Sequence, residues 1–258
     1  TIVGATPYLD EVGQCERIAF LKEGRLLGVD TPEVILDRFA SIFTPPVIER
    51  HNRGNMRQEE NVIDVSHLVK AFGAFHAVDD ISFSVRRGEI FGILGANGAV
   101  KTTAMHILTG LNQPTSGSGK VAGYDIRTEY EEIKKHIGYM SQKFSLYEDL
   151  TVAENFRLFG GIYGMRDDDI SHKTEIFLER LHFAEHRNDL VGSLPLGWKQ
   201  KLAFSVAIFH EPDIVFLDEP TGGVDPATRQ QFWELIYDAA NRGITVFVTT
   251  HYMDEAEY

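Results

Sequence analysis

The feature that most restricts the fold is a glycine-rich segment between an apolar run and a helix-forming run. The apolar run is Glu89 to Leu94, and the segment 95–103 reads Gly-Ala-Asn-Gly-Ala-Val-Lys-Thr-Thr. Strand, glycine-rich turn and helix in this order are the setting of a phosphate-binding loop, because backbone N–H groups and a helix N-terminus can surround phosphate oxygens. On its own, the segment is also open to interpretation as an ordinary glycine-rich turn before a helix.

Four apolar residues followed by two carboxylates form a second motif, Ile214–Leu217 with Asp218 and Glu219. At the end of a strand, Asp218 can complete the shell of a Mg²⁺ ion held by Thr102, and Glu219 can polarise an attacking water. Lys101 would then reach the β- and γ-phosphates. A strand ending in a solvated acidic turn is the alternative, but the two motifs together favour an ATPase that uses ATP and Mg²⁺. The candidate nucleotide contacts in the glycine-rich segment are Gly95, Asn97, Gly98, Ala99, Val100, Lys101, Thr102 and Thr103.

Apolar patterns indicate further strands and helices. Compact apolar runs at 89–94, 213–217 and 244–248 suit strands buried on both faces, whereas 81–85 alternates as a half-buried strand does. Helical patterns occupy 101–111, 151–163, 171–181, 199–209 and 227–240. This order predicts an α/β fold: a P-loop NTPase core with a mostly parallel sheet, an antiparallel β layer near the start of the domain, and an inserted helical subdomain over about residues 144–206.

An internal repeat predicts the domain organisation. Residues 5–12 match the residue types of 249–256 without a gap. The chain is therefore expected to begin with the tail of one domain copy, residues 1–36, with strands at 18–21 and 25–29. A second copy is expected at 61–258, truncated at its C-terminus. Residues 37–60, which contain Pro45-Pro46, are predicted to be a linker. Chance similarity between two acidic helix starts is the alternative to the repeat.

The bulk composition limits partners and compartment. A formal net charge of −13 at pH 7 excludes a broad basic surface, so no nucleic-acid partner is expected. Cys15 is the single cysteine, which indicates a reducing cytosol. The apolar runs are far shorter than the ~20 residues that span a bilayer, and no signal peptide is expected. Work at a membrane would therefore need another chain to supply the membrane part.

With these motifs in place, residues 61–258 resemble the ATPase domains of ATP-binding cassette (ABC) transporters, and residues 1–36 resemble the tail of another such domain. The matching positions are Phe72 for an adenine-stacking aromatic, Gln142 for the Q-loop glutamine, Gly222-Gly223-Val224-Asp225 for the D-loop, and His251 for the switch histidine. Singly, Phe72 would be a core aromatic, Gln142 a surface residue and His251 a strand-end histidine. In this order the resemblance implies catalytic roles for Glu219, His251 and Gln142. It implies Mg²⁺ ligation by Thr102, Gln142 and Asp218.

Two positions depart from the family pattern. The signature loop, Leu-Ser-Gly-Gly-x in the family, is here Leu194-Pro195-Leu196-Gly197-Trp198. In the family this loop holds the γ-phosphate of an ATP bound to the opposite domain, whereas proline offers neither a hydroxyl nor an N–H. Val100 stands where the P-loop normally has glycine before its lysine. A β-branched residue is unfavourable there if the backbone must approach phosphate or adopt an unusual angle.

The resemblance implies an ATP-binding and ATP-hydrolysing subunit of an ABC exporter. Its partners would be a separate membrane permease and a second ABC ATPase domain on the same full-length chain. The segment 144–155 is similar to the Q-loop region of bacterial drug-exporter ATPases with two such domains. The expected location is cytoplasmic, peripheral on the cytoplasmic face of the inner membrane. Two alternatives stay open: a soluble tandem ABC ATPase acting on the ribosome, which the short linker disfavours, and a nucleotide-binding module made catalytically weak by Val100.

The resemblance also implies two unequal ATP sites. Family members pair head to tail, and each ATP lies between the P-loop of one domain and the signature loop of the other. Pro7 stands where the second copy has His251, and the altered signature would face that same first-copy site. We therefore expect one structural site and one hydrolytic site, the latter built on Lys101. The strands at 18–21 and 25–29 are expected either to dock on an open sheet edge of the second domain or to pack irregularly.

Overall fold

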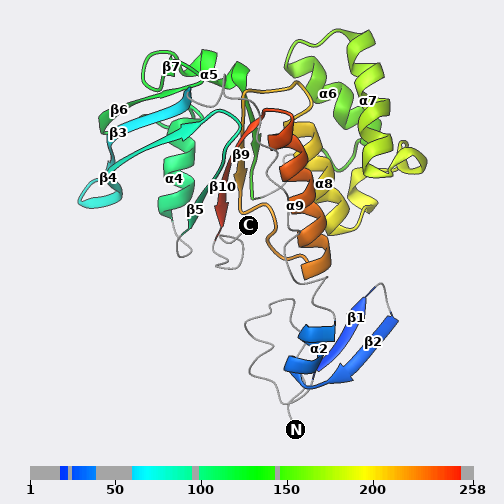
Figure 1. Cartoon of the computed structure of the whole chain (residues 1–258). Coiled ribbons are helices and arrows are strands. Elements are labelled where there is room, and N and C mark those ends of the chain that lie inside the picture. The colour runs from blue at the N-terminus through cyan, green and yellow to red at the C-terminus, as the bar shows by residue number, and fades with distance from the viewer. Residues whose placement is uncertain (1–17, 23–24, 39–59, 95–98, 143–145, 251–258) are drawn as a thin grey trace. The chain divides into compact units, whose positions relative to one another are not determined.

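A computed structural model describes residues 18–22, 25–38, 60–94, 99–142 and 146–250 (Figure 1). The chain divides into two compact units, residues 1–52 with 221–235 and residues 53–220 with 236–258. Within the described ranges, every helix is too short or too polar to cross a lipid bilayer.

The first unit contains a small hairpin and a helix. Strands β1 (Ile18–Lys22) and β2 (Arg25–Asp30) form where the sequence predicts two strands. They pair antiparallel with each other, and α2 (Pro32–Arg38) follows. The sequence patterns do not predict helix α2, although Pro32 at its first position and Glu33 in its first turn are favourable helix-start residues. Helix α2 extends two residues into the predicted linker, which begins at residue 37. The linker residues 39–59 lie outside the described ranges. The domain boundaries and the docking of the hairpin stay predictions.

The second unit is built on a four-stranded parallel sheet. Its order is β5 (Ile90–Leu94), β10 (Thr245–Thr250), β9 (Ile214–Asp218) and β8 (Ile137–Met140). Every residue of β9 and β10 is buried, which explains their continuous apolar character. All four strands run the same way, so their carboxyl ends share one edge of the sheet.

A second sheet is antiparallel and forms a separate layer. It consists of β4 (Phe75–Arg86), β3 (Asn61–Phe72), β6 (Ser116–Val121) and β7 (Tyr124–Asp125), in that order. Gly117 in β6 has φ +88°, and a Cβ there would lie 2.2 Å from the carbonyl oxygen of His67. This close approach requires glycine at position 117. The sequence Ser116–Val121 has a low strand propensity, and it forms a strand here because it pairs with β3.

Helix α4 (Ala99–Leu108) packs between the two sheets. Its buried residues Met105, Ile107 and Leu108 join one hydrophobic cluster with side chains of both sheets. The cluster includes Ile63, Leu68 and Val85 of the antiparallel sheet and Ile137, Ile214, Phe216 and Phe247 of the parallel sheet. Because α4 is anchored from both sides, the position of its first turn relative to the strand ends is fixed by core packing.

Helices α6 (Val152–Ile162), α7 (Asp167–Leu181) and α8 (Leu196–Ala207) form the expected helical subdomain. Figure 1 shows them on the side of the parallel sheet away from β3, β4 and β6. Thr151 caps α6 through a reciprocal pair of bonds with Glu154, and an isolated bridge joins Thr151 to Leu190. The remaining helices are α5 (Tyr130–His136) and α9 (Pro226–Asn241), with short 3₁₀ turns at Ala184–His186 and Val191–Ser193.

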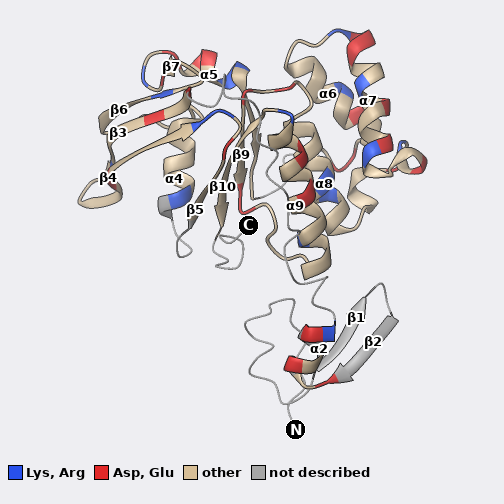
Figure 2. Cartoon of the chain, in the orientation of Figure 1, with Lys and Arg blue, Asp and Glu red and all other residues tan. Residues whose placement is uncertain are grey.

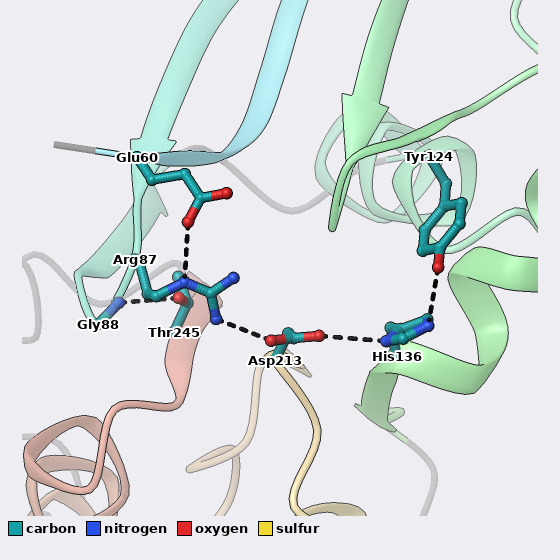
Figure 3. A network of polar contacts seen from close by, with 7 residues as sticks. All are labelled: Glu60, Arg87, Gly88, Tyr124, His136, Asp213 and Thr245. Atoms are coloured by element: carbon teal, nitrogen blue, oxygen red, sulfur yellow. Dashed lines mark hydrogen bonds and ion pairs between the residues drawn. The ribbon is translucent and has the colours of Figure 1, made fainter. Parts of the chain in front are cut away.

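A polar network ties the layers together at the amino ends of β9 and β10 (Figure 3). Arg87 donates to Asp213 at 2.7 Å and lies 3.5 Å from Glu60. Asp213 also contacts His136 at 3.2 Å, and His136 contacts Tyr124 at 3.2 Å. The bond to Asp213 raises the pKa of Arg87 above its ordinary value. Beyond this network, acidic and basic residues are interspersed over the described helices and strands (Figure 2).

Candidate nucleotide site

The candidate residues meet at the carboxyl edge of the parallel sheet. Lys101 and Thr102 lie in the first turn of α4, and Asp218 is the last residue of β9. Glu219 follows Asp218 directly, and Gln142 comes two residues after β8 ends. Ligands of open α/β sheets bind at this edge, because the loops that leave the strands converge there. Gly95, Asn97 and Gly98 fall outside the described residues.

Direct contacts connect these residues in pairs. The carboxylate of Glu219 lies 3.4 Å from Lys101 Nζ through Oε1 and accepts from Gln142 Nε2 at 2.9 Å through Oε2. Thr102 Oγ1 donates to Asp218 Oδ2 at 3.2 Å. The Lys101 side chain is 4% exposed and that of Glu219 is 12% exposed. Residues from β9, from α4 and from beyond β8 therefore form one cluster that contains both signs of charge. Its charged side chains are largely buried, whereas Gln142 is exposed.

The available donor atoms fit a hard divalent cation. Thr102 offers a hydroxyl, Asp218 a carboxylate and Gln142 an amide carbonyl, and Mg²⁺ prefers oxygen ligands of these kinds. The contact between Thr102 and Asp218 already places two of these groups together. Thr103, the last of the candidate contacts in the glycine-rich segment, is a buried residue of α4.

Glu219 has an unusual backbone. Its φ is +48°, in the left-handed region that non-glycine residues seldom occupy. Its N–H donates to the carbonyl oxygen of Thr249 at 3.1 Å and lies 3.2 Å from the Thr249 hydroxyl. Such a conformation costs on the order of 1–3 kcal/mol and persists where the surroundings enforce it. Here the end of β10 supplies the hydrogen-bonding partners that hold it.

Thr249 is a site residue that sequence reasoning misses. In the sequence it stands out only as part of the repeat, yet its hydroxyl donates to Asp218 Oδ1 at 2.7 Å. A threonine at the end of an apolar strand gives a weak signal, because threonine is common in strands for its shape alone. His251, two residues further on, lies outside the described residues.

Tyr139 of β8 lies close to the cluster. Burial and then the charge of Asp218 raise the pKa of Tyr139 to about 12. Its hydroxyl therefore stays neutral at physiological pH, 3.4 Å from His106 Nε2. Tyr139 also lines a small pocket together with Met140, Leu146, Phe159, Tyr163, Ala203, Val206 and Ala207. The lining combines residues of β8 with residues of helices α6 and α8.

Phe72 occupies the last position of β3, with 53% of its surface exposed. Lys70 Nζ lies 5.1 Å from the centre of its ring. The exposure rules out the alternative of a core aromatic. An exposed ring is available for stacking, and the stacking on adenine stays a prediction.

The signature-like residues mark the start of α8. Leu194 is buried, Pro195 is the N-cap, and Leu196 and Gly197 begin the helix with Leu196 exposed. Trp198 stacks on Phe183 with ring centres 4.7 Å apart. In the D-loop segment Gly222-Gly223-Val224-Asp225, the carboxylate of Asp225 accepts from the N–H groups of Ala227 and Thr228 at 3.1 Å and caps α9.

The Val100 backbone is helical, because Ala99 and Val100 are the first two residues of α4. The left-handed conformation considered for Val100 is therefore not required. An α-helical φ is accessible to valine, so an unusual backbone angle is no longer a reason to expect poor ATP binding at this position.

Comparisons with known proteins place this chain in a family. A family model described as ABC transporter matches residues 78–222, more than half of the chain. In Escherichia coli K12, the probable multidrug ABC transporter ATP-binding protein YbhF is 50% identical over 203 residues, covering 77% of this chain and 34% of that protein. In Bacillus subtilis, the linearmycin resistance ATP-binding protein LnrL is 34% identical over 197 residues, covering 76% of this chain and 63% of that protein.

A solved structure of an ATP-binding subunit of an ABC transporter has a TM-score of 0.68 at 27% identity, covering 76% of this chain and 82% of that chain. The present chain spans about a third of the length of the E. coli relative and just under two thirds of the length of the B. subtilis relative.

Proposed function

This chain belongs to the ABC transporter ATPase family, and from that premise we propose that it is the ATP-hydrolysing subunit of an ABC exporter. The observation that carries the proposal is the cluster of Lys101, Thr102, Gln142, Asp218 and Glu219 at one edge of the sheet. Such a cluster combines a cation for phosphate, oxygen ligands for Mg²⁺ and a carboxylate base, which together are the parts that phosphoryl transfer to water requires.

Each residue has a distinct task in the proposed reaction. Lys101 exchanges its ion pair with Glu219 for the β- and γ-phosphates of ATP. Glu219, released from Lys101, polarises the attacking water as general base. Thr102 and Asp218 hold the Mg²⁺, which neutralises charge on the phosphates when bound. Gln142 is hydrogen-bonded to Glu219 and follows the movement of its carboxylate.

We propose that the partners are a membrane permease and a second ABC ATPase domain that precedes this one on a longer chain. The names of the relatives, a probable multidrug transporter and a linearmycin resistance protein, support export of small toxic compounds. The greater length of the E. coli relative and the internal repeat support a second domain. Co-purification of the full-length protein with a membrane subunit is expected, whereas co-purification with ribosomes would favour the tandem ribosomal ATPase.

The substitution Glu219→Gln tests the assigned base. It retains the shape of the side chain and its contact with Gln142 but removes the base, so hydrolysis should fall by at least about 100-fold while ATP binding is largely retained. The matched control is Glu179→Gln on the exposed face of α7, which should leave both unchanged. ATP turnover and equilibrium ATP binding are measured for both variants. Unchanged turnover in the Glu219 variant would reject the assignment.

A further inference from the structure

We propose that Thr249 is a positioning residue for the ATP reaction: its hydroxyl orients the carboxylate of Asp218 toward Thr102 and holds the backbone of Glu219. This inference rests on the proposed ATPase function and adds to it a residue outside the P-loop and the acidic pair. Thr249 would touch neither ATP nor Mg²⁺, and would act only through the two carboxylate residues.

The Thr249 hydroxyl makes two hydrogen bonds, one as a donor and one as an acceptor. The hydroxyl donates to Asp218 Oδ1 at 2.7 Å, and the hydroxyl oxygen accepts from the Glu219 N–H at 3.2 Å. Thr249 and Asp218 are register partners in the parallel strands β10 and β9, so their side chains leave the sheet on the same face. Thr249 is fully buried and Asp218 is 4% exposed, so water cannot readily replace this bond.

The bond selects one orientation of the Asp218 carboxylate. With Oδ1 accepting from Thr249, the second oxygen, Oδ2, is directed at Thr102 Oγ1, 3.2 Å away. Partners that orient a metal-binding carboxylate in this way commonly contribute about 10–100-fold to metal affinity. Without the hydroxyl, Asp218 would have a buried oxygen with one donor fewer and would be free to rotate away from Thr102.

A purely structural role is the alternative, and Thr245 on the same strand provides the comparison. Thr245 is also fully buried, and its hydroxyl accepts from the N–H of Gly88 at 2.9 Å. It lies at the amino end of β10, beside the polar network of Figure 3, at the opposite end of the strand from Asp218. Both threonines contribute a buried hydrogen bond to folding, but of the two, Thr249 is the one bonded to a candidate Mg²⁺ ligand.

The experiment measures how much Mg²⁺ strengthens ATP binding. The affinity of the chain for ATP is determined by equilibrium titration into the millimolar range, with Mg²⁺ and again with EDTA, and the ratio of the two affinities is the Mg²⁺-dependent gain. The variants are Thr249→Val, which keeps the shape without the hydroxyl, Thr249→Ala, Thr249→Ser, which keeps the hydroxyl, and Thr245→Val. Thermal unfolding of each variant records the structural effect separately.

We expect Thr249→Val and Thr249→Ala to reduce the Mg²⁺-dependent gain about tenfold, with little change in the affinity measured in EDTA. Thr249→Ser should retain the gain, and Thr245→Val should retain it despite a comparable loss of thermal stability. Equal gains in the Thr249→Val and Thr245→Val variants would overturn the inference, as would a Thr249→Ser variant that fails like Thr249→Val. A reference chain that binds ATP without any Mg²⁺-dependent gain would overturn the assigned Mg²⁺ ligands and this inference together.

Discussion

Val100 shows at the residue scale how a backbone conformation changes a steric argument. In the sequence it replaces the glycine that normally precedes the P-loop lysine, and a strained backbone is one of the two reasons to expect poor ATP binding. Because Val100 lies in the first turn of α4, the strain is absent, and the steric bulk of valine is the one reason that remains. The expected defect is therefore one of nucleotide binding rather than of folding.

Val100→Gly should strengthen ATP binding about tenfold, the equivalent of about 1.4 kcal/mol. Because glycine is a poorer helix former, the same variant should lose up to about 1 kcal/mol of folding stability. Val100→Ala, which removes the branch but keeps helix propensity, should improve binding without that loss. Isothermal titration with ATP and urea unfolding measure the two quantities. If Val100→Gly leaves ATP affinity unchanged, the side chain does not obstruct phosphate.

At the scale of elements, the contact between β8 and α8 determines where Gln142 lies. A Cβ on Gly138 would be 2.0 Å from the carbonyl oxygen of Ala207, so the strand and the end of the helix meet without room for a side chain. Gln142 comes just beyond the end of β8. A change in this contact should therefore affect both the stability of the fold and the geometry of the site.

Gly138→Ala should destabilise the chain by about 1–3 kcal/mol, because the methyl group meets backbone that can only move as part of α8. Gly161→Ala in the exposed face of α6 is the control, since a Cβ added at Gly161 would have no described atom within 4 Å. That control should be neutral or gain up to about 1 kcal/mol from helix propensity. Urea denaturation measures both, and equal stabilities would contradict the close packing of β8 against α8.

His210, after α8, introduces a pH dependence. Burial lowers the pKa of His210 to about 4, and the ring stacks on Tyr163 with centres 3.5 Å apart. The unfolded chain takes up this proton near pH 6.5, so it binds more protons than the folded chain between about pH 6.5 and 4. The stability that the neutral ring contributes is therefore present above that window and is lost as the pH falls through it.

Between about pH 7 and pH 5.5 the contribution of His210 to unfolding free energy should fall by roughly 1 kcal/mol. His210→Gln removes the titrating group, so the variant should lose correspondingly less stability over this interval than the unsubstituted chain. His172→Gln, an exposed substitution on α7, should keep the original pH dependence. Urea midpoints at the two pH values measure the difference, and parallel pH dependences of all three proteins would show that His210 titrates normally.

At the scale of the whole molecule, we predict two unequal ATP sites in a full-length protein that carries the preceding domain. The signature-like residues are Pro195, the N-cap of α8, and Leu196, its first residue, and they would face the ATP of the other domain. His251→Ala in the full-length background should therefore abolish most hydrolysis. Substituting the signature with Pro195→Ser and Leu196→Gly should leave turnover nearly unchanged, because it alters the structural site. ATP turnover per dimer of domains measures both, and the reverse pattern would exchange the assignment of the two sites.

Elements with local signals could be predicted from the sequence. Strand β9, which ends in Asp218, and the helix after the glycine-rich segment are predictable, because continuous apolar runs and turn residues act over a few neighbouring positions. The same local patterns predict the three helices of the inserted subdomain. They do not reveal β6, which is rich in serine and glycine, or the four-residue strand β8, because these segments form strands only where their neighbours supply hydrogen bonds and packing.

Which distant residues share the site depends on tertiary structure. Thr249 lies beside Asp218 because β10 and β9 pair in one register, and a sequence pattern gives the period of a strand but not its neighbour. The left-handed backbone of Glu219 and the exposure of Phe72 are likewise outside the reach of local patterns. Both depend on hydrogen bonds and packing between segments far apart in the chain, and those contacts exist only once the sheets have formed.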